Sequence, residues 1–307
     1  MYAMLVGSKE HMKHVVFYSG GASSWCTAQR VIERHGADNV TLYFTDTLIE
    51  CADLYRFLIE GAAHLFGVTG LEDVVRAAAE LPETTDEEAI EVRKAVLPGL
   101  AAATMAAIPQ FVWFIDGRTP WDVFYDVRMM GSTRADPCSR VLKREPSHKW
   151  IESNYTPDEV VLHIGMDWTE MHRLEGTRRA WAPYQVEAYM AEKPLLLKDQ
   201  MLSLVRDAGI AVPRLYGLGH SHNNCSGWCV KAGHAQFRHL LETSPDVFDW
   251  HARNEVEFAE FIGSEVAIMR DRTGGSTSPF QMHRLRGERG TEQQERLDWG
   301  GCGCFIG

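Results

Sequence analysis

The sequence predicts an α/β protein built around a parallel β-sheet, and three features of the chain support this prediction. Short apolar runs rich in β-forming residues recur at 14–18, 40–45, 111–115 and 160–164. Helical stretches separate these runs, and such alternation is typical of βα units whose strands lie parallel. The chain has 307 residues, of which 45% are apolar, so it can bury a large core.

The elements of the first part follow in chain order. The strand His14–Tyr18 leads through a glycine- and serine-rich turn into a helix at Trp25–His35, which Gly36 ends as a C-cap. The strand Val40–Thr45 is followed by a turn and a helix at 53–66. Further helices are expected on both sides of the third strand, at 86–96 and 121–126.

The composition shifts near Pro194, and helical runs dominate from there to the C-terminus, at 199–207, 235–242 and 247–262. We therefore expect two parts, an α/β part at 1–193 and a helical part at 194–307. The segment 270–278 is rich in Gly, Ser and Arg, which favours a flexible loop.

Charge and composition exclude several classes of protein. Lys and Arg number 31 against 42 Asp and Glu, so the formal net charge is −11, which argues against a broad surface for nucleic acid but allows a local basic groove. No apolar run is long enough for a membrane span, and residues 1–14 lack the order of a signal peptide. With seven cysteines and no disulfide framework, we expect a cytoplasmic protein.

A phosphate-binding loop is predicted at Ser19-Gly20-Gly21-Ala22-Ser23-Ser24, between the first strand and its helix. Glycines let backbone N–H groups approach a ligand, and the helix N-terminus directs its positive dipole to the same place. The serines add hydroxyl groups. The alternative is a plain strand-to-helix turn. The segment is neither a Walker loop nor a GxGxxG motif.

Charged residues beside the other strands are candidate ligands, each with a structural alternative. Asp46 ends the second strand, where it would bind a hard cation or a ribose, although Asp46 or Thr47 could instead cap the next helix. Arg118 and Lys143 are candidate anion ligands within a basic stretch that could also be a solvated face. Arg173 is a candidate phosphate or sulfate ligand, or merely a surface partner of Glu170.

The remaining candidates are cysteines. Cys225 and Cys229 are spaced C-x3-C in a turn-like segment, and Cys302 and Cys304 are spaced C-x-C near the C-terminus. Four thiolates are the ligand count of a structural Zn²⁺ site and of a [4Fe–4S] cluster. Buried free thiols, the alternative, fit Cys26 and Cys51 better than these two close pairs.

Four motifs, taken in order over residues 14–180, resemble those of a known family. SGGASS is similar to the pyrophosphate loop of the PP-loop ATP pyrophosphatases, which have the adenine nucleotide alpha-hydrolase-like fold. Three further segments resemble the phosphoadenylyl-sulfate (PAPS) reductase branch: Phe44-Thr-Asp-Thr47 with Glu50, Cys138 with Lys143 and Pro146, and Gly165 with Glu170 and Arg173. The two cysteine pairs resemble a subgroup found in bacterial and phage genomes, including mobile elements.

The resemblance implies a PP-loop nucleotide-binding domain at 1–193 and a cysteine-bearing helical region at 194–307. It implies that an adenine nucleotide, ATP or a sulfonucleotide (APS or PAPS), is bound with Mg²⁺ by the loop and strand-end residues Ser19, Gly20, Gly21, Ser23, Ser24, Asp46, Thr47, Arg118, Lys143, Gly165, Glu170 and Arg173. Many ATP pyrophosphatases have Asp where this chain has Ser23, so Asp46 is the alternative metal ligand.

The same resemblance implies a [4Fe–4S] cluster, or alternatively Zn²⁺, on Cys138, Cys225, Cys229 and Cys302. Asp46, Arg173 and Cys304 are then the expected catalytic residues. The implied function is ATP-dependent adenylation with pyrophosphate release, coupled to sulfur transfer. Expected partners are a tRNA or DNA substrate, a sulfur donor protein and a second copy in a homodimer. The alternatives are an APS/PAPS reductase and a non-catalytic nucleotide sensor with structural zinc.

Overall fold

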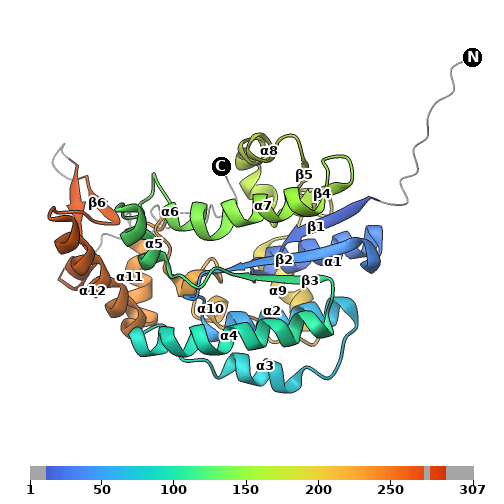
Figure 1. Ribbon diagram of the computed structural model, residues 1–307, viewed down its shortest axis with the longest axis horizontal. Helices are drawn as coiled ribbons and strands as arrows, with labels where there is room; N and C mark the ends of the chain where they lie inside the picture. The colour runs from blue at the N-terminus through green and yellow to red at the C-terminus, as the bar shows by residue number, and fades with distance from the viewer. Residues whose placement is uncertain (1–11, 273–276, 288–307) are drawn as a thin grey trace, which may run out of the picture.

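The computed structural model describes residues 12–272 and 277–287, and its centre is a five-stranded parallel sheet (Figure 1). The strands lie in the order β3-β2-β1-β4-β5. Their bounds are β1 (Lys13–Phe17), β2 (Val40–Asp46), β3 (Phe111–Ile115), β4 (Val160–His163) and β5 (Gln185–Glu187). The predicted α/β architecture is thus confirmed, with four strands where they were expected; β5 was missed because it is only three residues long.

Alternating side chains bury both faces of the sheet. Val16 and Tyr18 pack into one hydrophobic cluster with α1 and α2, whereas Val15 and Phe17 pack into another with α7 and α8. Figure 1 shows α7 above the sheet and α2, α3 and α4 below it. The helices of these two layers are α1 (Ala22–His35), α2 (Ala52–Phe66), α3 (Glu72–Ala79), α4 (Glu87–Ala107), α7 (Glu145–Asn154), α8 (Leu174–Trp181) and α9 (Lys198–Asp207).

A second core lies at one end of the molecule, at the left in Figure 1. There α5 (Pro120–Val127) packs with α11 (His234–Thr243) and α12 (Pro245–Ile262), all close to their predicted positions. The expectation of a flexible loop at 270–278 was wrong at its ends. An antiparallel pair, β6 (Met269–Asp271) and β7 (Ser278–Phe280), lies there because buried Met269 pairs with buried Phe280.

Two further differences from the predicted elements have simple causes. The helix expected at 86–96 continues as α4 to Ala107, past Pro98, because Leu97, Leu100 and Ala101 still face the core. From the C-terminal part, α9 packs on α1, and its Met201 and Val205 belong to the cluster under the sheet. The first segment of the predicted helical part therefore shares a core with the sheet, whereas α11 and α12 belong to the second core.

Short elements connect these layers: α6 (Pro137–Ser139), η3 (Arg140–Arg144), α10 (Arg214–Gly217), η2 (Ala37–Asn39), η4 (Trp168–Arg173), η5 (Tyr189–Ala191), η6 (Cys225–Gly227) and η8 (Met282–Arg286). Within the described ranges, we find no helix that has both the length and the apolar character needed to cross a membrane.

Candidate functional site at the carboxyl edge of the sheet

The predicted phosphate loop lies at the point where the strand order reverses. β1 is followed by β2 and β3 on one side and by β4 and β5 on the other, so the loop after β1 and the loop after β4 flank a topological switch point. Open α/β sheets bind ligands in this crevice, beyond the carboxyl ends of their strands. The structure therefore places Ser19–Ser24 where a nucleotide site is expected.

Gly20 and Gly165 let this edge pack tightly. Gly20 has a φ of +80°, and a Cβ there would lie 2.7 Å from Cγ of Leu54. A Cβ on Gly165, after β4, would lie 3.0 Å from the backbone N and Cα of Ser24. The two loops of the switch point therefore touch, and both positions require glycine.

The N-terminus of α1 faces this loop without a side-chain cap. The Ser24 hydroxyl donates to the Gly21 carbonyl oxygen at 2.8 Å and lies 3.4 Å from the hydroxyl of Ser19. The backbone N–H of Ala22 donates to the Tyr216 hydroxyl at 3.1 Å. Backbone amides and the dipole of this 14-residue helix thus give the loop positive character.

Two cations, the predicted Arg173 and the unpredicted Lys198, lie close enough to the same neighbours that the charges of both act on Glu170 and His222. Arg173 on η4 forms an ion pair with Glu170, and both side chains are less than a third exposed. Burial raises the pKa of Glu170, although the charge of Arg173 opposes this. Lys198, at the start of α9, donates to the Ser23 hydroxyl at 3.3 Å and lies 5.6 Å from the centre of the Tyr216 ring.

His222 lies among these groups as a neutral imidazole. Its pKa is lowered to about 4, first by burial and then by the charges of Lys198 and Arg173. The sequence analysis missed Lys198, because only the packing of α9 on α1 brings it to the loop. Its position at the start of a predicted helix gave no signal of a ligand site.

Asp46 is buried within the turn that follows β2. One carboxylate oxygen accepts hydrogen bonds from the backbone N–H of Leu48 and the hydroxyl of Tyr55, both at 2.7 Å. The other accepts from the Trp113 indole N–H at 3.1 Å. Burial raises the pKa of Asp46 to about 6. The carboxylate thus holds the turn rather than capping a helix, since α2 begins only at Ala52. Its role as a cation ligand stays a prediction.

The two predicted basic ligands, Arg118 and Lys143, both form ion pairs with carboxylates. Arg118 forms surface ion pairs with Asp116 and Asp126, which raise its pKa. Lys143 is buried, and its Nζ lies 3.6 Å from a carboxylate oxygen of Glu50. The guanidinium of Arg118 is thus held by two carboxylates, Lys143 lies beside the cysteines, and a role of either residue in nucleotide binding stays a prediction.

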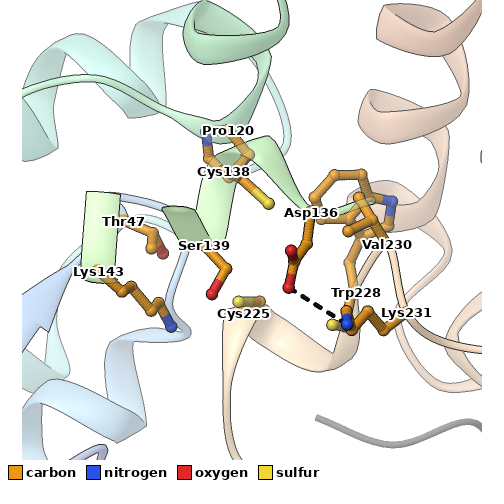
Figure 2. A pocket seen from close by; sticks show the side chains of 11 residues that line it. Thr47, Pro120, Asp136, Cys138, Ser139, Lys143, Cys225, Trp228, Val230 and Lys231 are labelled. Carbon is orange, nitrogen blue, oxygen red and sulfur yellow. Dashed lines mark ion pairs between the residues drawn. The ribbon is translucent and has the colours of Figure 1, made fainter. Parts of the chain in front are cut away.

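Three of the predicted metal ligands, Cys138, Cys225 and Cys229, line one pocket. The pocket has about 390 Å³ of empty space, part of it open to solvent. Figure 2 shows the thiols of Cys138 and Cys225 turned toward its interior. Its other lining residues are Thr47, Pro120, Asp136, Ser139, Lys143, Trp228, Val230 and Lys231.

Local geometry aims Cys138 and Lys143 into this pocket from the same side. They are five residues apart on α6 and η3, and η3 is a π-helical turn. Both residues line the pocket. The pocket also holds an ion pair between Asp136 and Lys231 at 3.4 Å, drawn dashed in Figure 2.

Glu50 anchors the cysteine segment to the turn after β2. Cys225, Ser226 and Gly227 have successive φ values of 52°, 50° and 81°, a left-handed run that non-glycine residues rarely adopt. The buried Glu50 carboxylate accepts a hydrogen bond from the Cys225 backbone N–H, and the Ser226 hydroxyl donates to the Ile49 carbonyl at 2.7 Å. The sequence analysis had not ranked Glu50 as a site residue.

The same segment also reaches the phosphate loop. The buried side chain of Asn223 donates from Nδ2 to the Gly20 carbonyl oxygen at 2.8 Å, two residues before Cys225. Residues 223–229 therefore connect the phosphate loop to the cysteine pocket through direct contacts. The two sites are neighbours along one edge of the sheet.

A complete metal ligand set is not seen in residues 12–272 and 277–287, where no group of three or more His, Cys, Asp or Glu side chains could hold a metal ion. The three cysteines share a pocket without forming a closed set. Cys302 and Cys304 lie outside the described residues, so the four-thiolate site stays a prediction.

When the chain is compared with known proteins, it matches no family model, and no curated protein or solved structure matches it.

Proposed function

We propose that the protein is an adenine-nucleotide-binding PP-loop enzyme of sulfur chemistry. It adenylates a substrate with ATP, releases pyrophosphate and transfers sulfur through the cysteine pocket. The observation that carries this proposal is the segment 223–229, which hydrogen-bonds the phosphate loop at Gly20 and presents Cys225 and Cys229 to the pocket. A nucleotide held at the loop would therefore lie beside thiols.

The residues of the loop are suited to a pyrophosphate leaving group. In the proposed reaction, a substrate oxygen attacks the α-phosphorus of ATP and the bond to the β-phosphate oxygen breaks. The amides at the start of α1, Lys198 and Arg173 would stabilise the negative charge that develops on the departing pyrophosphate. A sulfur nucleophile then displaces AMP from the adenylated substrate.

Among the described residues near the loop, the two carboxylates that could bind Mg²⁺ already have other partners. The Asp46 carboxylate is enclosed by three donors, and the Glu170 carboxylate pairs with Arg173. Hard cations prefer oxygen ligands, and the hydroxyl oxygens of Ser19, Ser23 and Ser24 are weaker ones than carboxylates. We therefore assign the positive charge at the loop to Lys198 and Arg173 and assign no step to the metal.

The thiols of Cys138, Cys225 and Cys229 suit the chemistry of a [4Fe–4S] cluster or of Zn²⁺, with the fourth ligand proposed at Cys302. When bound, a cluster would hold or deliver sulfur, whereas zinc would only fix the segment. Lys143 and Lys231, which also line the pocket, would stabilise thiolates electrostatically.

A second candidate function is reduction of a sulfonucleotide. It is supported by the cations Arg173 and Lys198 beside the loop, which suit a sulfate as well as a phosphate, and by Ser23 in place of an acidic residue. In this reaction a C-terminal cysteine thiolate, proposed as Cys304, would attack the sulfur of adenylyl sulfate, so that the bond from sulfur to the AMP phosphate oxygen breaks, AMP leaves and the cysteine carries a sulfonate. A second thiol, from an external dithiol reductant, would then attack this adduct, release sulfite and leave a disulfide.

The decisive test is nucleotide binding by calorimetry, with ATP and adenylyl sulfate compared on the wild-type protein and on Lys198→Met. We expect Lys198→Met to weaken binding about tenfold, since a charge-assisted contact to phosphate is lost. Lys149→Met, which removes an exposed lysine on α7, is the control and should bind normally.

The substrate that turns over separates the candidates. ATP-dependent pyrophosphate release supports the first function, and sulfite release from adenylyl sulfate in the presence of a dithiol reductant supports the second. Tight binding without either reaction would indicate a nucleotide sensor. If the wild-type protein binds neither nucleotide, the proposed function is wrong.

A further inference from the structure

A separate hollow lies outside the two sites described above. It is formed where the loop before α6 meets the β6–β7 hairpin, and it has about 610 Å³ of empty space including its open mouth. We refer to it as the arginine hollow, after the residues that line it: Ser132, Thr133, Arg134, Arg270, Arg272 and Thr277.

The lining of the arginine hollow is entirely cationic or hydroxylic, which is unusual in a chain with a net charge of −11. Other arginines near it are neutralised: Arg140 pairs with Glu145, and Arg144 pairs with Asp136. None of the three arginines of the hollow has an ion-pair partner among the described residues. Like charges that converge in this way repel one another unless an anion lies between them.

The chemistry of the lining indicates a phosphate group. Guanidinium groups bind phosphate oxygens in pairs of parallel hydrogen bonds, and hydroxyls of Ser and Thr are common additional donors. No aromatic or apolar side chain lines the hollow, so nothing there would hold a base or a sugar ring. The arginines are also solvent-exposed, which suits a polyanion that remains largely in water.

The arginine hollow is close to the cysteine pocket. Arg134 lies in the loop before α6 and Cys138 lies in α6, four residues later, and four residues of chain span at most about 14 Å. Asp136, between them, lines the cysteine pocket and forms the ion pair with Lys231. A strand whose backbone lies in the hollow could therefore reach the cysteine pocket.

We propose that the arginine hollow binds backbone phosphates of a nucleic-acid strand and so presents this strand to the cysteine pocket as the sulfur acceptor. The phosphate site stands on its own geometry, whereas the identity of the acceptor rests on the proposed function. Because the contacts are to phosphates, binding should depend strongly on salt and little on base sequence.

The test is fluorescence anisotropy with labelled single-stranded 20-nucleotide RNA and DNA of mixed sequence. The triple variant Arg134→Gln/Arg270→Gln/Arg272→Gln should weaken binding about tenfold or more at ~100 mM salt. The slope of log K against log salt should become shallower by about 2, since three phosphate contacts at about 0.7 each are lost. Arg76→Gln/Arg179→Gln/Arg206→Gln, with the same change in net charge, should bind within about twofold of wild type.

Three results would overturn the inference. The wild-type protein could fail to bind either strand, the two triple variants could weaken binding equally, or inorganic phosphate could bind the hollow while the strands do not. Because the arginines are exposed, the variants should fold. The single variant Arg134→Gln should also weaken strand binding relative to the control, by a smaller factor than the triple variant.

Nucleotide binding in the same variants separates this inference from the proposed function. ATP should bind the hollow variant normally, and Lys198→Met should still bind the strands. If the strands bind through the hollow but ATP does not bind the wild-type protein, the hollow stands and the proposed enzyme activity fails. If ATP binds the wild-type protein but the hollow variant binds the strands as well as wild type does, the proposed nucleotide binding stands and the inference about the hollow fails.

Discussion

The phosphate loop and the cysteine pocket lie at the same edge of the sheet but are built in different ways. The loop is one short segment whose shape depends on backbone conformation, with Gly20 at a φ of +80°. The pocket takes Cys138 and Cys225 from segments 87 residues apart and depends on side-chain contacts such as that of Glu50. A site shaped by backbone conformation tolerates few substitutions of its glycines. A site assembled from side chains distant in sequence depends instead on the buried groups that hold its segments together.

The largest effect should come from Glu50→Gln, which tests the dependence of the pocket on one buried group. This change removes the carboxylate that compensates the buried Lys143 ammonium, at 3.6 Å, and that accepts from the Cys225 N–H. Loss of one member of a buried ion pair typically costs several kcal/mol, so we expect the free energy of unfolding to fall by about 3–4 kcal/mol. Urea denaturation followed by tryptophan fluorescence measures this change.

An exposed ion pair provides the control for this substitution. Glu91→Gln removes the partner of Lys94 on the surface of α4, where an ion pair contributes about 0.5 kcal/mol or less. Equal losses in the two variants would contradict the role assigned to Glu50. A loss confined to Glu50→Gln, together with greater reactivity of Cys225 toward a thiol reagent, would show that Glu50 holds the cysteine segment in place.

A somewhat smaller effect is expected from Gly20→Ala in the phosphate loop. The added Cβ would lie 2.7 Å from Cγ of Leu54, and the alanine would have to keep a φ of +80°. We therefore expect a loss of about 3 kcal/mol in unfolding free energy and weaker nucleotide binding. Thermal and urea unfolding measure the first, and calorimetry measures the second.

Gly36→Ala separates the effect of the positive φ from the effect of the close contact with Leu54. Gly36 also has a φ of +80°, but a Cβ there would meet nothing within 4 Å. We expect it to lose only the conformational part, about 1–2 kcal/mol, because Gly36 has a ψ of 143° and lies in a region that alanine rarely adopts. Should both alanine variants lose the same amount, close packing against Leu54 would not be what the loop requires.

The smallest effect concerns the pH dependence of Asp46, which lies between the two sites. Burial raises its pKa to about 6, while in the unfolded chain a carboxyl ionises near about 3.9. The unfolded state therefore loses its proton first, and this group contributes stability that falls as the pH rises from about 4 to about 6 and then stays constant.

In Asp46→Asn this contribution is absent. We expect the difference in unfolding free energy between wild type and variant to decrease by on the order of 2 kcal/mol between pH 4 and pH 6. Buried histidines such as His163, whose pKa is lowered to about 3, act equally in both proteins and cancel in this difference. A difference that does not change over this range would mean that Asp46 ionises normally in the folded chain.

Local patterns in the sequence were enough to predict most of the fold. The strand at 111–115 and the C-cap at Gly36 lie where they were expected, because apolar periodicity and turn glycines act over a few residues. The same patterns failed at 270–278, where Met269 pairs with Phe280, a residue that is not its neighbour in the sequence, in an antiparallel strand pair. They also failed at Pro98, where burial of the flanking residues outweighs the loss of one backbone N–H.

For the candidate sites, the sequence by itself placed residues 19–24 in the turn between the first strand and its helix, and the family resemblance grouped Cys138, Cys225 and Cys229, which line one pocket. Only the tertiary structure decided that Lys198 contacts the loop, that Arg118 pairs with Asp126, and that Arg134, Arg270 and Arg272 line one hollow. The physical reason is the distance along the chain over which each interaction acts. Backbone conformation and capping are set by neighbours in sequence, whereas the position of a long cationic side chain is set by which helices pack together.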